Sequence, residues 1–131
     1  MKTEKELLIE DLIDHSVLMQ LEQDVGIATL ARLMQLFVTE LINLHELLSD
    51  AIKKSNIEEI QHVVHILKNS AAQFGAMPLA ILAQNLHDTE NIPPEQQIID
   101  ASIVLKSIEK SRLSYQELVN KLANQGGENE N

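Results

Sequence analysis

Apolar residues recur every three or four positions in several stretches of this chain, and this spacing is the strongest constraint on its fold. In the clearest stretch the apolar positions are Ile27, Leu30, Met34, Phe37, Leu41, Leu44, Leu48 and Ile52. Such a stripe is typical of a helix that buries one face in a bundle. We find no stretch with the alternating period of a β-strand.

Residues that commonly begin or end helices mark the remaining elements. We expect a short leading helix capped by Asp14 or Ser16 and ended by Gly26, a helix from Ile57 to Gly75, another from Pro78 to about Glu90, and a last one from about Glu95 to Ala123. The connections between them are short. The sequence therefore predicts an all-α fold, an antiparallel four-helix bundle with a short additional N-terminal helix.

The bundle is expected to occupy residues 14–123 as a single domain, which suits a length of 131 residues. The charged residues 1–13 are predicted to be a flexible N-terminus, and the polar residues 124–131 a disordered tail. Met1 and this polar end favour a free-standing protein.

The net charge of −10 opposes binding to phosphate backbones, so no nucleic-acid partner is expected. The chain has no cysteine, which excludes disulfides and thiol chemistry. The N-terminus lacks the apolar segment of a signal peptide, and no continuous apolar run approaches the roughly 18 residues of a membrane span. We therefore expect a cytoplasmic protein with no membrane partner, present as a monomer.

Nucleotide-binding motifs are also missing from the sequence. There is no phosphate-binding loop, and the only adjacent glycines are Gly126 and Gly127. The chain should therefore not act as an autonomous kinase, although it could still carry a phosphoryl group.

His65 is the candidate reactive residue. In a helical projection from Ile57 it lies near the middle of a polar arc made of Glu58, Gln61, His62, His65, Lys68, Asn69 and Ala72. A neutral imidazole is a competent nucleophile near neutral pH, and Lys68, three residues later on the same face, could offset the charge of a phosphoryl group. An exposed histidine with no special role is the more common case when position alone is considered.

A histidine metal site is the weaker alternative. His62 and His65 could share a metal with His45 on the preceding helix, but the number of ligands falls short of a closed site. No metal and no cofactor are therefore expected on this chain.

A longer motif favours the reactive role of His65 over these alternatives. The segment His65-x-Leu67-Lys68-x-Ser70-Ala71-Ala72-x-Phe74-Gly75-Ala76-x-x-Leu79 resembles the signature of histidine-containing phosphotransfer (HPt) domains of phosphorelays. The segments Leu18-x-x-Leu21-Glu-x-x-x-Gly26 and Leu33-Met-Gln-Leu36-Phe37 resemble the usual approach to that signature, so the likeness spans about residues 16–120. The segment from His65 to Ala76 especially resembles the HPt proteins of quorum-sensing phosphorelays.

The resemblance implies that His65 accepts a phosphoryl group from a receiver-domain aspartate and passes it to another receiver domain. It also implies that Lys68 assists electrostatically and that Gly75 lets the two hairpin helices approach. The expected partners are response-regulator receiver domains and a hybrid sensor histidine kinase, with Mg²⁺ held by the receiver. A receiver commonly presents an apolar surface, so Leu18, Met19, Leu21 and the segment Leu41 to His45 are candidates for the docking face or, alternatively, for the core.

Two positions depart from the family pattern. Asn69 stands where many members have glycine and could crowd the phosphoryl group. His87 stands where several relatives have a glutamine that bonds the active imidazole; it could take over that role or be a surface residue, and Gln84 is the fallback. Gln61 and Ala72 are further supporting candidates. Asn69 keeps open a rival function, a non-catalytic helical module that docks a receiver or kinase without carrying phosphate.

Overall fold

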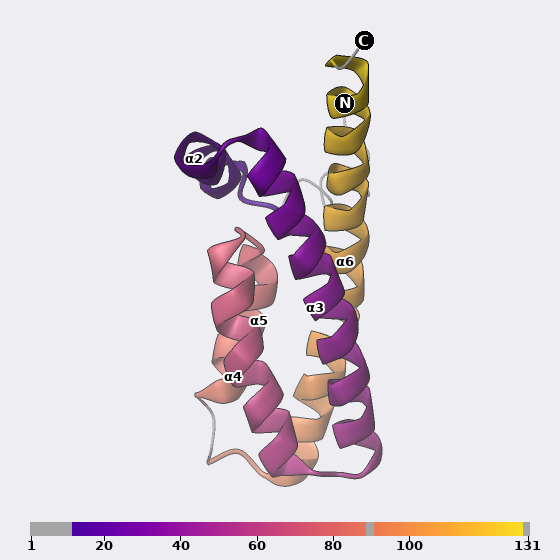
Figure 1. Ribbon diagram of the computed structural model, residues 1–131. Coiled ribbons are helices and arrows are strands. Elements are labelled where there is room, and N and C mark those ends of the chain that lie inside the picture. Colours follow the sequence, from indigo (N-terminus) through magenta and orange to yellow (C-terminus); the bar gives the residue numbers. More distant parts are fainter. Residues whose placement is uncertain (1–11, 89–90, 130–131) are drawn as a thin grey trace, which may run out of the picture.

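The computed structural model describes residues 12–88 and 91–129, with side chains up to residue 124, and this part of the chain is helical. The helices are α2 (His15–Val25), α3 (Ile27–Lys53), α4 (Ile57–Gln73), α5 (Met77–His87) and α6 (Pro94–Asn129). Figure 1 shows α3 running beside α6, and α4 beside α5, with α2 at one end of the bundle. The predicted all-α bundle with a short leading helix is confirmed.

The apolar stripes found in the sequence form the core. On α3 the buried residues are Leu30, Met34, Phe37, Val38, Leu41, Leu44, Leu48 and Ala51. α3 packs on α4 and α6, and α5 packs on the other side of the same two helices, which closes a ring of four. Phe37 lies at one end of this core, stacked on Phe74 with ring centroids 4.7 Å apart and edge-on to Tyr115 at 5.0 Å.

Side-chain caps fix where two of the helices begin. The Asp14 carboxylate accepts a hydrogen bond from the Ser16 amide at 3.0 Å, and the Asn56 side chain accepts one from the Glu59 amide at 3.1 Å. Asp14, rather than Ser16, is therefore the cap of α2, and Asn56 caps α4. Each satisfies a backbone N–H group that has no partner within its helix.

The packed structure begins earlier than the predicted boundary at residue 14. Ile13 is buried, and the Asp14 amide donates to the Gly75 carbonyl at 2.7 Å. The rest of the predicted flexible N-terminus, residues 1–11, lies outside the described residues.

Two helix ends also differ from the prediction. α5 ends at His87 rather than near Glu90, and residues 89–90 lie outside the described part. α6 continues six residues past Ala123, through Gly126 and Gly127, to Asn129. A glycine costs only about 1 kcal/mol relative to alanine in a helix, and no proline follows to stop it. Of the predicted tail, residues 130–131 are not described.

α3 is long and apolar enough to cross a membrane when length and composition alone are considered. The core helix of a globular protein passes the same test, and the apolar stripe of α3 is buried against its neighbours. Polar residues such as Glu40 interrupt its sequence, so no continuous apolar run marks it.

Candidate functional site

His65 lies in the middle of α4 with its side chain exposed. The opposite face of α4 is entirely inside the bundle, where Ile60, Val63, Val64, Leu67 and Ala71 are inaccessible to solvent. The helical projection thus separates the two faces correctly. The reactive candidate is presented on a helix whose position the core fixes.

One neighbour of the His65 ring comes from α5. The rings of His65 and His87 have centroids 5.0 Å apart and are tilted by 36°. The Lys68 Nζ atom lies 3.3 Å from His87 Nδ1. Because an ammonium group only donates, a hydrogen bond between these two atoms requires the tautomer of His87 that carries its proton on Nε2. Three residues from two helices therefore form one cluster: His65, Lys68 and His87.

Asp88 and Gln84 form the edge of this cluster. Gln84 Nε2 donates to Asp88 Oδ2, and this bond is the main reason that the pKa of Asp88 is lowered, with His87 and Lys68 adding to the effect. Asp88 Oδ1 lies 3.6 Å from His87 Nδ1. Gln84 thus binds Asp88 rather than orienting His65.

Asn69 lies on the exposed face of α4, but its amide group is bound to the backbone. Its Nδ2 atom donates to the His65 carbonyl oxygen at 3.3 Å. The side chain is therefore directed along the helix toward the preceding turn. Ala72, also exposed, leaves the surface one turn further free of bulk.

Gln61 lies beneath the candidate site and ties three elements together. Its Nε2 atom donates to the Leu86 carbonyl at 3.2 Å and to Gln97 Oε1 at 2.9 Å, and Gln97 in turn donates to the Ile92 carbonyl at 2.8 Å. Gln97 is 4% exposed and was not a sequence candidate. The only sequence signal for it was a polar residue at a core-facing position of the last helix.

Gly75 lies where the start of α2 approaches the corner between α4 and α5. Its φ angle is +81°, and a Cβ atom there would lie 2.8 Å from the Asp14 carbonyl oxygen and 3.1 Å from Val17 Cβ. These contacts give Gly75 a role at α2, and its implied role in the approach of the hairpin helices stays a prediction. The start of α2 crosses so close to the corner after α4 that only glycine fits.

Of the other histidines considered as metal ligands, His62 lines the same depression as His65, whereas His45 does not. His45 is half-buried on α3 and lies near Glu109 of α6, whose pKa is lowered first by its hydrogen bond with Arg112 and also by His45. Within residues 12–88 and 91–129, no group of three His, Cys, Asp or Glu side chains is placed to hold a metal ion.

The predicted docking residues divide between the core and the surface. Leu18, Leu41 and Leu44 are buried, whereas Met19 is 60% exposed. Exposed apolar residues also occur on the helices that flank α4, among them Leu36, Leu47, Met77 and Ile81. The sequence could not distinguish the buried from the exposed apolar residues, because a shift of one position places either kind on the apolar stripe of its helix.

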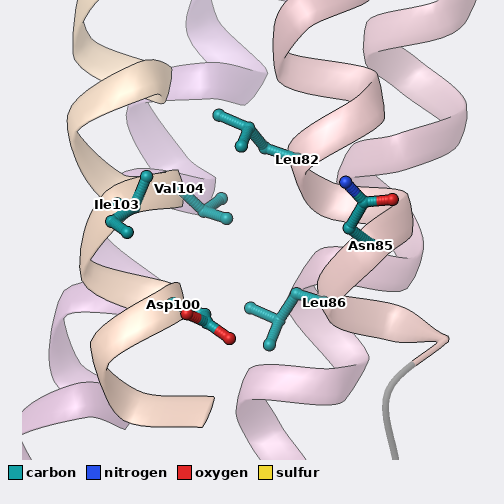
Figure 2. A pocket seen from close by; sticks show the side chains of 6 residues that line it. All are labelled: Leu82, Asn85, Leu86, Asp100, Ile103 and Val104. Carbon is teal, nitrogen blue, oxygen red and sulfur yellow. The ribbon is translucent and has the colours of Figure 1, made fainter. Parts of the chain in front are cut away.

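Two hollows border α5. An open depression at the first half of α4 is lined by Asn56, Glu58, Glu59, Gln61, His62, His65 and His87. Figure 2 shows the other, between α5 and α6, where Leu82, Leu86, Ile103 and Val104 point toward one another and Asn85 and Asp100 are the polar lining groups. This second pocket, of about 240 Å³, lies on the side of α5 that faces α6 and holds none of the His65 cluster.

Comparison with known proteins shows which family and which solved structure the chain is similar to. Among curated protein sequences, none matches the chain significantly. The crystal structure of histidine-containing phosphotransfer protein B (HptB) from Pseudomonas aeruginosa PAO1 is similar in fold, with a TM-score of 0.72 and 17% sequence identity over 87% of this chain and 96% of that one. The family model of the Hpt domain matches residues 32–125, which cover α4, α5 and nearly all of α3. The family model thus covers well over half of this helical bundle, which presents His65 and Lys68 on its outer face. The chain belongs to the Hpt domain family.

Proposed function

We propose that this protein carries a phosphoryl group on His65, accepting it from a receiver-domain aspartate and passing it to a second receiver domain. The supporting observation is the exposed His65–Lys68–His87 cluster on α4 and α5 of an Hpt-family bundle. The chain supplies a placed nucleophile and a cation, and the chemistry needs little else from it.

The transfer is an in-line displacement at phosphorus. The lone pair of the unprotonated His65 ring nitrogen forms the N–P bond, while the bond from phosphorus to the aspartyl oxygen breaks and the carboxylate leaves with the electron pair. The proton on the other ring nitrogen stays there until it exchanges with solvent. The transferred group carries about two negative charges, and the Lys68 ammonium is within one helical turn to offset them.

Mg²⁺ belongs to the receiver in this scheme. It would neutralise the phosphoryl oxygens from the receiver's side during transfer, while His65 approaches from the other side. This chain therefore needs only an accessible imidazole, and the exposure of His65 meets that need.

The partners proposed are response-regulator receiver domains and a hybrid sensor histidine kinase. Such partners place the protein in the cytoplasm, where a monomeric bundle would shuttle between them. The apolar residues exposed beside α4, such as Met77 and Ile81, provide surface that a receiver would cover on docking.

Transfer from a radiolabelled phosphorylated receiver tests the proposal. Wild-type protein should acquire an acid-labile, base-stable label, as expected of a phosphoramidate, and His65→Gln should acquire none. His62→Gln, a matched change of an exposed histidine one turn earlier on α4, should label like the wild type. Equal labelling of wild type and His65→Gln would contradict the assignment.

The same variants distinguish the phosphoryl carrier from the rival function, a binding module. A binding module that docks a receiver without carrying phosphate would bind wild-type and His65→Gln equally and take no label in either form. Asn69, the residue that suggested this rival, has its amide bonded to the His65 carbonyl rather than placed over the ring, which favours the carrier.

A further inference from the structure

The His65 cluster contains one group with a choice of two partners, the Nδ1 atom of His87. Lys68 Nζ lies 3.3 Å from it, within hydrogen-bonding distance, and Asp88 Oδ1 lies 3.6 Å from it, just beyond. A lysine ammonium can only donate and a carboxylate can only accept. The protonation state of Nδ1 therefore decides which neighbour His87 can bond.

We propose, building on the phosphotransfer function above, that His87 is a positioning residue: its unprotonated Nδ1 holds the Lys68 ammonium ready for the phosphoryl group on His65, and protonation of Nδ1 turns His87 to Asp88 and releases Lys68. This differs from the orienting role of a residue that bonds the active imidazole. His87 acts on the lysine, and only through it on the transferred group.

The benefit of this arrangement comes from side-chain entropy. A free lysine samples many rotamers, and fixing one costs free energy comparable to a single hydrogen bond. His87 takes part of this loss in advance, because it holds Nζ at a ring whose centroid lies 5.0 Å from that of His65 before the phosphoryl group arrives. A phosphoryl dianion is a stronger acceptor than a neutral imidazole, so Lys68 would then transfer its hydrogen bond over a short distance.

Groups of both signs of charge lie around His87. Charged or titratable groups facing it are Lys68, His65, His62, Glu58 and Glu59 from α4 and Asp88 at the end of α5; the described part of α6 adds none to this depression. The carboxylate of Asp88 is already engaged by Gln84 through its other oxygen, which leaves Oδ1 open to a protonated His87.

Phosphorylation by phosphoramidate tests the role of His87 without any receiver. We expect His87→Ala to be phosphorylated about three- to tenfold more slowly than wild type at about pH 8, where an imidazole is neutral. His87→Gln keeps an acceptor for Lys68 and should restore the wild-type rate. Rates of His87→Ala and His87→Gln that are equally low, or His87→Ala equal to wild type, would overturn the proposal.

Dependence on Lys68 and on pH distinguishes positioning from a structural effect. In a Lys68→Ala background, His87→Ala should have no further effect, since the two residues act as one unit. At about pH 5.5, where an imidazole is largely protonated, the wild-type rate should fall to that of His87→Ala while His87→Gln keeps its advantage over both. Taking rate ratios at each pH cancels the protonation of His65 itself.

Two controls complete the design. His62→Ala, which removes an exposed histidine from the same depression, should leave the rate unchanged. Nitrogen-15 NMR of unphosphorylated wild type should show Nδ1 of His87 unprotonated at about pH 8, where an imidazole is neutral; a protonated Nδ1 there would overturn the proposal. Absence of any phosphorylation in wild type would instead contradict the carrier function, whereas normal labelling with no effect of His87 would contradict only this inference.

Discussion

The residues proposed for the chemistry all lie outside the core. His65 is exposed, Lys68 and His87 are half-buried at the hairpin surface, and none of the three belongs to the apolar cluster that holds the bundle together. Changes at these positions should therefore alter transfer without unfolding the protein, because surface substitutions usually change stability by less than about 0.5 kcal/mol.

Lys68→Ala gives the first test at this scale. We expect phosphorylation of His65 to slow about tenfold, which corresponds to about 1.4 kcal/mol of lost transition-state stabilisation. The melting temperature should stay within a degree or two, since the side chain makes its contact at the surface with His87. Lys106→Ala, an exposed lysine on α6, is the control and should match wild type in both measurements. An unchanged rate in Lys68→Ala would remove Lys68 from the mechanism.

The sequence and the family resemblance pointed to His65, Lys68 and His87 as parts of one site, but not to the contact between Lys68 and His87. His65 and Lys68 share a helix, so the 3.6-residue period was enough to place them on one polar face. The bond between Lys68 and His87 joins residues 19 positions apart and depends on how α4 and α5 pack. The same limit applies to Gln61, whose place on the polar arc gave no sign that it bonds to α5 and α6.

At the scale of elements, the corner between α4 and α5 is the most constrained point of the fold. Residue 74 accepts a hydrogen bond from the Tyr115 hydroxyl at 2.7 Å, and residue 75 accepts one from the Asp14 amide at 2.7 Å. Burial raises the pKa of Tyr115, so its hydroxyl stays protonated and able to donate. The corner thus joins α2 and α6 to the hairpin that carries His65.

Gly75→Ala should weaken this corner strongly. The positive φ alone costs about 1–2 kcal/mol for a residue with a side chain, and the new Cβ would also meet the Asp14 carbonyl, so we expect a total loss of about 2–4 kcal/mol in the free energy of unfolding. Gly26→Ala shows backbone strain without a clash, because nothing lies within 4 Å of its new Cβ while its φ of +86° and ψ of 163° form a conformation that only glycine adopts readily. Urea unfolding measures both variants, and a loss in Gly75→Ala no larger than the roughly 1 kcal/mol of the positive φ alone would contradict the steric argument.

Asp14 should give α2 a dependence on pH. Hydrogen bonds from the Ser16 side chain and amide lower the pKa of Asp14 below its usual value. A lowered pKa means that this contribution to stability is present above the ordinary titration range of an aspartate, near pH 4, and is lost as the pH falls through the native value. The protection factors of the α2 amides, which compare each exchange rate with the intrinsic rate at the same pH, should thus fall in acid for wild type, while Asp14→Ala should have low protection already at neutral pH. A wild-type α2 whose exchange protection does not fall in acid would contradict this role.

Element types were predictable and some element ends were not. The apolar stripes and the caps at Asp14 and Asn56 define local geometry that a sequence displays directly. The predicted end of α6 is wrong because its two adjacent glycines lower helix stability without blocking the next hydrogen bond. The crossing of α2 over Gly75 depends on tertiary packing, which a local pattern does not contain.

On the scale of the whole molecule, the charge balance limits stability. Twenty acidic and ten basic residues give a net charge of −10, and the described ion pairs, such as Lys54–Asp50 and Arg112–Glu109, connect neighbours on one helix. Such exposed pairs stabilise the fold only slightly, so repulsion among the remaining carboxylates outweighs them.

Added salt should therefore stabilise the bundle. Raising sodium chloride from about 0.01 M to about 0.15 M shortens the Debye length from roughly 30 Å to roughly 8 Å and should raise the melting temperature by a few degrees. Calorimetry at several salt concentrations measures the effect. A melting temperature that falls with salt would mean that attractive pairs outweigh the net negative charge.

The contacts at the corner between α4 and α5 also affect the order of folding. The corner joins Asp14, Phe37, Phe74 and Tyr115, which are far apart along the chain, so we expect it to close late, after the entropy of long loops has been lost. The α4–α5 hairpin, by contrast, joins near neighbours in sequence and brings His65 beside His87 through short-range contacts. A chain still leaving the ribosome would then have the surface around His65 assembled before α6 arrives to complete the bundle.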